Sequence, residues 1–285
     1  MSATDEFSLN RIDVRKAFDR AAQEYDAAAV LQREVGERLL ERLELTTVAP
    51  HRVLDVGCGT GRPTRRLQER YPDAQLLGAD LAPNMLKVAG RRPWYAPWQK
   101  RAAFVCADAT ALPFPETSFD ILYASLVLQW CDDLDGTLLE WRRLLKPHGL
   151  LLFSTLGPDT LKELRAAWSE VDGYNHVNRF LDMHDIGDAL IRAGFVEPVM
   201  DVEQMTLTYA DVRDLMRDLK RIGAHNVTAG RGRGLTGRKR LDALGNAYAR
   251  WRRDGRLPAT YEVVYGTAWA PKFMPMAALN NRGAR

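Results

Sequence analysis

A glycine-rich loop preceded by an aspartate is the feature of this 285-residue sequence that points most directly to chemistry. Residues 53–67 read VLDVGCGTGRPTRRL and place Asp55 ahead of Gly57, Gly59 and Gly61. Such a loop lets a ligand approach the backbone closely, and the helix that follows offers its N-terminal N–H groups. Dinucleotide sites have the spacing G-x-G-x-x-G; here it is G-x-G-x-G, and a carboxylate before it would repel a pyrophosphate. The loop therefore favours a cationic ligand without phosphate, such as S-adenosylmethionine.

Two further carboxylates end predicted strands later in the sequence. Asp80 ends LLGAD, about 20 residues after the loop, where a carboxylate can accept hydrogen bonds from both hydroxyls of a ribose. Asp108 ends the next predicted strand, in CADATALPF, where its oxygens can accept from an adenine amino group. A single aspartate at a strand end is also an ordinary cap of a helix or loop. Three at the carboxyl ends of successive parallel strands, together with the loop, indicate one shared ligand site.

The elements that would position these residues alternate along the chain. Short apolar runs predict strands over residues 52–57, 74–80, 102–108, 118–125, 150–156, 198–209 and 259–270. Helical patterns lie between most of them and fill residues 10–45 before the first. Strands that alternate with helices form right-handed βαβ units and a parallel sheet. We therefore expect an α/β fold with a doubly wound, mostly parallel seven-stranded sheet, N-terminal helices and a helical insertion before the last strand.

Composition places the chain among cytoplasmic proteins. Cys58, Cys106 and Cys131 are widely spaced and form no C-x-x-C pair, so neither a zinc site nor a disulfide framework is expected. The N-terminal residues are polar and lack the apolar core of a signal peptide, and no apolar run reaches the roughly 20 residues that span a bilayer. The net charge of +3 is uneven, because residues 213–256 hold 13 Lys/Arg against 4 Asp/Glu. Such segregation suggests an acidic partner.

The successive motifs resemble those of the class I S-adenosylmethionine-dependent methyltransferases. VLDVGCGTG, LLGADLAPNML, CADATALPFPETSFDILYAS and LLEWRRLLKPHGLLLFS carry this resemblance over about residues 15–156. It implies a cofactor-binding set that consists of Asp55, Gly57, Gly59, Gly61, Asp80, Leu81, Asp108, Ala109 and Ser125. Tyr25, in EYD, matches a position that often covers the ligand, although an ordinary core tyrosine fits the pattern equally well. We expect a helical cap over residues 1–45, a methyltransferase domain over 46–270 with a basic insertion at about 210–255, and a loose tail over 271–285.

The distal half is more specific. LQWCDD, LGPDTLKELRAAW, HVNRFLDMHDIGDAL, LMRDLKRIGAHN, GLTG and LPATYEVVYG resemble the malonyl-[acyl-carrier protein] O-methyltransferase family of biotin synthesis, so that the resemblance covers about residues 10–270. It implies transfer of a methyl group to the free carboxylate of a malonyl thioester carried on acyl-carrier protein. The resulting ester hides a charge, so that the enzymes of fatty-acid elongation accept the chain.

A carboxylate acceptor is ionised at neutral pH, so we expect orientation in line with the methyl group and assign no general base. Arg179, in HVNRF, is the strongest candidate for a fork that binds this carboxylate. A structural ion pair of Arg179 with Asp182 or Asp185 is an equally good interpretation. The weaker positioning candidates are His176, Gln129, Trp130 and the covering Tyr25. Trp130 also fits an ordinary core position.

The basic stretch suits an acidic carrier protein. Arg217, Lys220 and Arg221 have the i, i+3, i+4 spacing of one helix face. The other candidate partner-binding residues are Arg231, Arg233, Arg238, Lys239 and Arg240. Acyl-carrier protein is strongly acidic, so such a surface would steer and dock it. A solvated helix face is the plainer alternative. Nucleic acid is a less favoured partner, because aspartates interrupt the stretch and few aromatics accompany it.

Three other functions remain open at this level. A methyltransferase of the same fold for another small carboxylate, such as an aconitate-like acid, would share the cofactor motifs. GPDTLKELR and LPATYEVVY also resemble a respiratory complex I assembly factor of this fold, although HVNRF and GLTG favour the biotin family. An RNA methyltransferase is the third alternative. The absence from SLVLQWCDD of an Asn/Asp-Pro-Pro-aromatic motif argues against methylation of base nitrogens.

Overall fold

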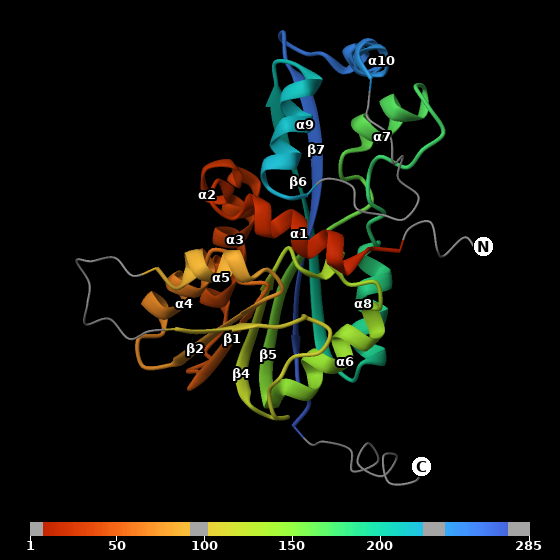
Figure 1. The fold of residues 1–285 in the computed structure, drawn as a ribbon. Helices are drawn as coiled ribbons and strands as arrows, with labels where there is room; N and C mark the ends of the chain where they lie inside the picture. The colour runs from red at the N-terminus through yellow and green to blue at the C-terminus, as the bar shows by residue number, and fades with distance from the viewer. Residues whose placement is uncertain (1–7, 92–101, 225–236, 273–285) are drawn as a thin grey trace, which may run out of the picture.

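The computed structural model describes residues 8–91, 102–224 and 237–272, and in these ranges its strands form one sheet (Figure 1). The strands are β1 Arg52–Val56, β2 Gln75–Asp80, β3 Ala103–Cys106, β4 Phe119–Ser125, β5 Leu145–Leu156, β6 Val196–Tyr209 and β7 Leu257–Trp269. Their order is β3-β2-β1-β4-β5-β7-β6, with β1 to β5 parallel and β7 antiparallel to both β5 and β6. The predicted doubly wound, mostly parallel, seven-stranded sheet is confirmed.

Helices precede, cover and interrupt this sheet. They are α1 Arg11–Ala21, α2 Tyr25–Ala28, α3 Val30–Glu41, α4 Arg62–Arg70, α5 Pro83–Ala89, α6 Leu134–Leu144, α7 Lys162–Ser169, α8 Met183–Arg192, α9 Val212–Arg221 and α10 Arg238–Tyr248, with 3-10 turns η1 Arg42–Leu45, η2 Leu128–Trp130 and η3 Ala249–Trp251. Asn10 and Asp211 begin α1 and α9 by accepting backbone N–H groups of the first turn. The described helices include none with the length and apolar character that crossing a bilayer requires.

Both faces of the central strands are buried, which explains their continuous apolar runs. Val53 of β1 belongs to the cluster that contains Leu39 of α3, whereas its neighbour Leu54 belongs to the cluster that contains Trp141 of α6. All four side chains are fully buried. The sheet is therefore held between a layer that includes α3 and a layer that includes α6, and its carboxyl edge is left for the loops.

The last two strands extend beyond the rest of the sheet. β6 and β7 pair along their whole length, whereas β5 pairs with β7 only as far as Leu156↔Val263. Around the projecting part of this ribbon, α9 contacts β6, while α7 contacts β7 and α10, as Figure 1 shows. The expected insertion between the last two strands thus contains α9 and α10; residues 225–236 and the expected tail from 273 onward lie outside the described residues. This ribbon supplies a second wall beside the carboxyl edge.

Candidate active site

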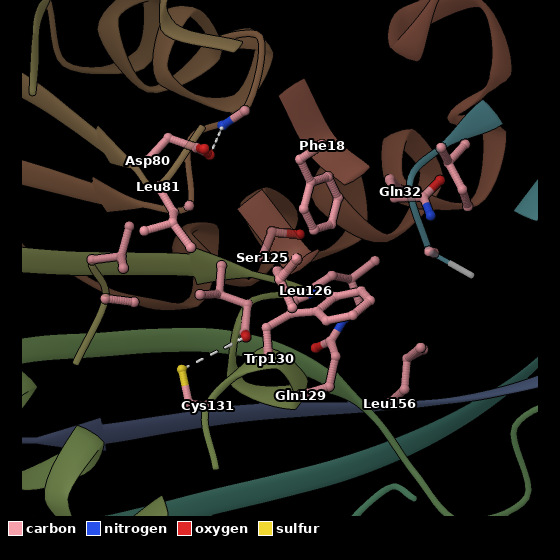
Figure 2. Close-up of a pocket in the computed structure, with 18 of the residues that line it drawn as sticks. Phe18, Gln32, Asp80, Leu81, Ser125, Leu126, Gln129, Trp130, Cys131 and Leu156 are labelled. Carbon is pink, nitrogen blue, oxygen red and sulfur yellow. Dashed lines mark hydrogen bonds between the residues drawn. The ribbon is translucent and has the colours of Figure 1, made fainter. Parts of the chain in front are cut away.

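A cavity opens at the carboxyl ends of β1, β2, β3 and β4, and residues of α1, among them Phe18, contribute to its lining (Figure 2). Seven residues of the predicted cofactor set line it: Gly57, Gly59, Asp80, Leu81, Asp108, Ala109 and Ser125. They come from the segments that follow four neighbouring strands, and only the parallel arrangement brings them together.

The glycine loop brings its backbone to the cavity wall. Gly57 and Gly59 have φ values of +65° and +53°, in the left-handed region that favours glycine. A Cβ on Gly57 would lie 2.3 Å from a methyl group of Val127, whereas a Cβ on Gly59 would meet nothing within 4 Å. Gly59 therefore faces open space, where a ligand can reach the main chain.

Asp80 is one of the two aspartates among the described residues that line the cavity. Its Oδ2 accepts the N–H of Gly59 at 2.9 Å, and its Oδ1 accepts the N–H of Ala82 at 2.8 Å. Although these bonds favour the ionised form, burial by the surrounding protein raises the pKa of Asp80 to about 6. The carboxylate is thus held in place and is only partly solvated. A ligand with hydroxyl donors or a positive charge would stabilise it, which is the requirement that the ribose and sulfonium of S-adenosylmethionine meet.

Asp55 and Gly61 differ from the expectation, because neither lines the cavity. Asp55 is 1% exposed and accepts the hydroxyl of Thr64 on α4, and burial raises its pKa to about 7. Gly61 has φ +76° at the start of α4, where a Cβ would lie 2.9 Å from the Cβ of Ala89. Both residues support the glycine loop without lining the cavity. Asp55 anchors α4, and Gly61 allows α5 to approach the start of α4.

Asp108 lies at the cavity but already has partners. Its Oδ1 accepts both the N–H and the hydroxyl of Thr110, at 2.9 and 2.8 Å. Its Oδ2 accepts Nη1 of Arg11 at 2.7 Å. Arg11 lines the cavity and was missed by sequence reasoning, because nothing in the sequence around it links it to a residue 97 positions away.

Aromatic residues cover the cavity. Phe18 of α1 meets Trp130 edge to face, with ring centroids 5.3 Å apart, and lies 6.5 Å from Tyr25. All three line the cavity, and Figure 2 shows Phe18 and Trp130 near its centre. Burial raises the pKa of Tyr25, so its hydroxyl keeps its proton at neutral pH and remains a donor. The predicted positions of Tyr25 and Trp130 at the ligand are thus compatible with the geometry.

The segment around HVNRF contributes different residues from those expected. Arg179 is exposed and does not line the cavity, whereas its neighbours Asn178 and Phe180 do. His176 is also outside the lining, since its ring stacks on Trp168 at 3.7 Å and its Nε2 lies 2.7 Å from an oxygen of Asp172. We therefore withdraw both residues as binders of an acceptor. Within this segment Arg179 is exposed, whereas Asn178 and Phe180 face the site.

A second wall comes from the projecting ribbon and the helices around it. Its lining residues are Leu156, Thr160, Leu161, Asn178, Phe180, Leu219, Ile222, Ala224 and Tyr261. Asn178 is 8% exposed, and its Oδ1 is buried without a hydrogen-bond partner, so it can accept an N–H or O–H from a ligand. Sequence reasoning missed this wall because it combines β5, β7, α9 and three connecting segments.

Gln129 has a defined orientation at the junction of the two walls. It lies in η2 directly after β4, and its Oε1 accepts the hydroxyl of the buried Thr155 at 3.2 Å. This bond leaves the Nε2 donors of Gln129 for the cavity, which agrees with its expected role as a positioning residue. Leu126 and Leu161, which line the same cavity, have φ values of +56° and +54°. Left-handed leucines cost of order 1–3 kcal/mol each and concentrate at functional sites.

The basic residues lie beside the second wall, and most are paired. Arg217 bonds Asp214 at 2.7 Å, Arg221 lies 3.4 Å from Glu24, and Lys220 is exposed. Their neighbours Leu219 and Ile222 line the cavity, so this end of α9 is at its rim.

The basic residues farther along the chain are on or before α10. Arg238 lies 4.0 Å from Asp242, Arg240 lies 3.8 Å from Asp172, and Lys239 is exposed. Arg231 and Arg233 lie outside the described residues.

Solved structures share this architecture. A solved protein from Bacillus halodurans is 20% identical, with a TM-score of 0.58, over 82% of this chain and 99% of that chain. Phosphoethanolamine N-methyltransferase 2 of Haemonchus contortus, solved in complex with S-adenosyl-L-methionine, is 20% identical, with a TM-score of 0.50, over 83% of this chain and 52% of that chain. At sequence identities of this level, the similarity to these solved structures shows that this chain shares their fold.

Sequence relatives are much closer. The family described as Methyltransferase domain matches residues 54–153. Malonyl-[acyl-carrier protein] O-methyltransferases of Gallionella capsiferriformans and Laribacter hongkongensis are 55% and 54% identical to this chain. The matches cover 94% and 98% of this chain and 93% and 95% of those proteins. This chain therefore belongs to the malonyl-[acyl-carrier protein] O-methyltransferase family.

Proposed function

We propose that this enzyme transfers the methyl group of S-adenosylmethionine to the free carboxylate of a malonyl thioester on acyl-carrier protein, an early step of biotin synthesis that builds the pimelate moiety. One observation carries the proposal: a single cavity joins the acidic cofactor end at Asp80 to the neutral second wall at Tyr261. The names of the relatives support the identity of the acceptor. We expect the reaction in the cytoplasm, which supplies both substrates.

The residues of the first wall fit the cofactor. Asp80 would accept the ribose hydroxyls, and the backbone of Gly57 and Gly59 would lie along the methionine part. Asp108 and Ala109 would flank the adenine, because they follow β3, which lies next to β2 in the sheet. When bound, S-adenosylmethionine supplies a methyl group on a positively charged sulfur. Beyond Gly57 and Gly59 a smaller hollow, lined in part by Arg33, Arg62 and Arg66, suits the α-carboxylate of the methionine part.

The chain's own residues position and dehydrate the acceptor. Phe18 and Trp130 cover the centre of the cavity and exclude water, and Ser125 and Leu126 mark the end of β4 beside the glycine loop. The acceptor oxygen forms a bond to the methyl carbon as the carbon–sulfur bond breaks, and the electron pair of that bond stays with sulfur. No proton moves, so no base is required. Holding the two reactants in line lowers the barrier by several kcal/mol.

The carrier would dock at the rim beside α9. Lys220 and Arg221 are exposed there, while Leu219 and Ile222 on the same turn line the cavity. A thioester arm entering at this rim would pass Asn178, whose Oδ1 lacks a partner. Positive charge at the rim would raise the rate of encounter with an acidic carrier.

The direct test is incubation with methyl-labelled S-adenosylmethionine and malonyl-carrier. We expect base-labile label on the malonyl group, little label on free malonate, and none on carrier without malonyl. An Asp80→Ala variant serves as the control for the site. Label on free malonate at the same rate would make the carrier dispensable, and no label on any malonyl species would exclude the proposed function.

A further inference from the structure

The cavity has an unusual charge balance for a site that accepts a carboxylate. Among its described lining residues, Arg11 is the one cation, and its guanidinium is bound to Asp108 at 2.7 Å. The polar groups of the second wall and its junction are neutral: Gln129, Trp130, Thr160, Asn178 and Tyr261. Arg179 is exposed outside the lining. A carboxylate that entered this region would leave water and would meet no free cation among the described lining residues, which is costly.

We propose that Gln129 holds the acceptor carboxylate through its amide N–H groups, and that the positive charge of the bound cofactor balances it. The acceptor site is then complete only after the cofactor has bound. This inference rests on the proposed function and specifies how the acceptor is recognised. It also replaces the expected arginine fork with a neutral donor.

The geometry of Gln129 supports this role. Its Oε1 is occupied by the hydroxyl of Thr155 at 3.2 Å, so the end of the amide that faces the cavity is the donor end. Figure 2 shows Gln129 and Trp130 adjacent to Ser125 and Leu126, which are the lining residues nearest in sequence to the end of β4. A carboxylate there would lie between the Gln129 donors and the loop that receives the cationic part of the cofactor.

The charge balance also favours the reaction. Methyl transfer joins an anionic oxygen to a carbon that leaves a cationic sulfur, so both charges disappear and the products are neutral. Loss of charge is favoured where the effective dielectric constant is low, as in a cavity covered by Phe18 and Trp130. The attraction that assembles the two substrates is absent between the two products, which assists their release.

Calorimetry with the full-length enzyme tests the role of the cofactor's charge. Malonyl-carrier is titrated into enzyme saturated with S-adenosylhomocysteine, or with an analogue that carries a protonated amine in place of the sulfonium. We expect binding to be about tenfold tighter, or more, with the cationic analogue. Carrier that bears the methyl ester of malonate is the matched uncharged probe and should bind equally to both complexes. Equal affinities of malonyl-carrier for the two complexes would overturn the inference.

Substitutions then test Gln129 itself. Gln129→Ala should weaken binding of malonyl-carrier to the cationic complex by about five- to thirtyfold and leave S-adenosylhomocysteine binding unchanged, which also shows that the variant folds. Gln75→Ala, at the exposed start of β2, is the control and should bind malonyl-carrier normally. Normal binding by Gln129→Ala, or a comparable loss in Arg179→Ala, would contradict the assignment. If wild-type enzyme methylates malonyl-carrier but shows no dependence on cofactor charge, this inference fails and the proposed function stands.

Discussion

Arg11 Nη1 lies 2.7 Å from Asp108 Oδ2 and joins the start of α1 to the loop after β3. Because Thr110 occupies the other carboxylate oxygen, an adenine amino group that approached Asp108 would compete with Arg11 for Oδ2. The side chains of Arg11 and Asp108 are 50% and 27% exposed, so the ion pair is weak and a ligand can displace it. Leu9 adds a backbone hydrogen bond to Asp132, so α1 is tied down at its first residues.

Removing this competitor should favour the cofactor. We expect Arg11→Ala to bind S-adenosylhomocysteine up to about fivefold more tightly by calorimetry, because Asp108 Oδ2 becomes available. Arg15→Ala, on the same helix and 3.9 Å from Asp19, is the matched control and should change nothing. Weaker binding by Arg11→Ala alone would mean that Arg11 contacts the ligand directly.

Asp80 is expected to lower the stability of the ligand-free protein. Its pKa of about 6 is above the ordinary value of 3.8, so the ionised form at pH 7 is disfavoured by folding. Asp80→Asn removes the buried charge but keeps only one oxygen for the N–H groups of Gly59 and Ala82, so it should raise the midpoint of thermal unfolding by less than Asp55→Asn does, and it should weaken S-adenosylhomocysteine binding more than about tenfold. Asp55→Asn should also raise the midpoint, since burial raises that pKa too, but should bind almost normally. Equal losses of binding in both variants would show that Asp55 contributes to the site as strongly as Asp80.

The same pKa predicts how cofactor binding depends on pH. Ionised Asp80 is the form that best accepts ribose hydroxyls, so affinity for S-adenosylhomocysteine should be level above pH 7. Affinity should fall below about pH 6, by up to about tenfold per pH unit. In the ligand-free protein, the contribution of Asp80 to the free energy of unfolding changes in the opposite sense. This contribution is lost as pH rises through 6 and is fully present below the pKa of the unfolded state. Calorimetry between pH 5 and 8 checks the first trend, and a profile equally steep in Asp80→Asn would assign it to another group.

Two alanine substitutions distinguish folding from ligand contact in the glycine loop. Gly57→Ala would place a Cβ 2.3 Å from Val127 Cγ2 at φ +65°, so it should cost more than the roughly 1–2 kcal/mol of left-handed strain. Gly59→Ala has the same left-handed backbone strain but no contact like that with Val127. Its methyl group instead enters the open space of the cavity. We expect Gly59→Ala to be the more stable variant and still to lose cofactor binding. Urea unfolding and calorimetry measure the two effects; full binding by Gly59→Ala would mean that the ligand does not approach this residue.

Charge reversal at the rim tests docking of the carrier. Lys220→Glu combined with Arg221→Glu should raise the KM for malonyl-carrier about tenfold at low salt and leave S-adenosylhomocysteine affinity unchanged. Arg192→Glu, an exposed position on α8, reverses one charge elsewhere and should leave that KM unaltered. An identical KM in the rim variant would show that the carrier docks on another surface.

Much of the fold and of the cofactor wall could be predicted because the signals are local. The loop at Gly57 and Gly59 and the acids Asp80 and Asp108 lie at or just after the ends of strands, and parallel strands bring their carboxyl ends to one edge. Side-chain direction was harder to predict. Asp55 occupies a strand end as well, yet its carboxylate faces Thr64, because one residue along a strand changes the face on which a side chain lies.

The acceptor wall could be predicted only in part, since it depends on long-range packing. Residues 170–182 have no helix or strand whose period would show that Asn178 faces inward and Arg179 outward. Tyr261 and Leu219 reach the cavity because β7 and β6 project beyond β5. The apolar runs in the sequence do not specify how far these two strands project. The positive charge of Arg179 favoured it in the sequence, whereas the described residues that line this wall are neutral.

The mass of intact malonyl-carrier after incubation with enzyme and S-adenosylmethionine tests the central claim most directly. We predict a gain of one methyl group in place of the carboxyl proton, and a much smaller methylated fraction with Asp80→Asn at the same cofactor concentration. An unchanged mass with wild-type enzyme that binds the cofactor normally would contradict the account.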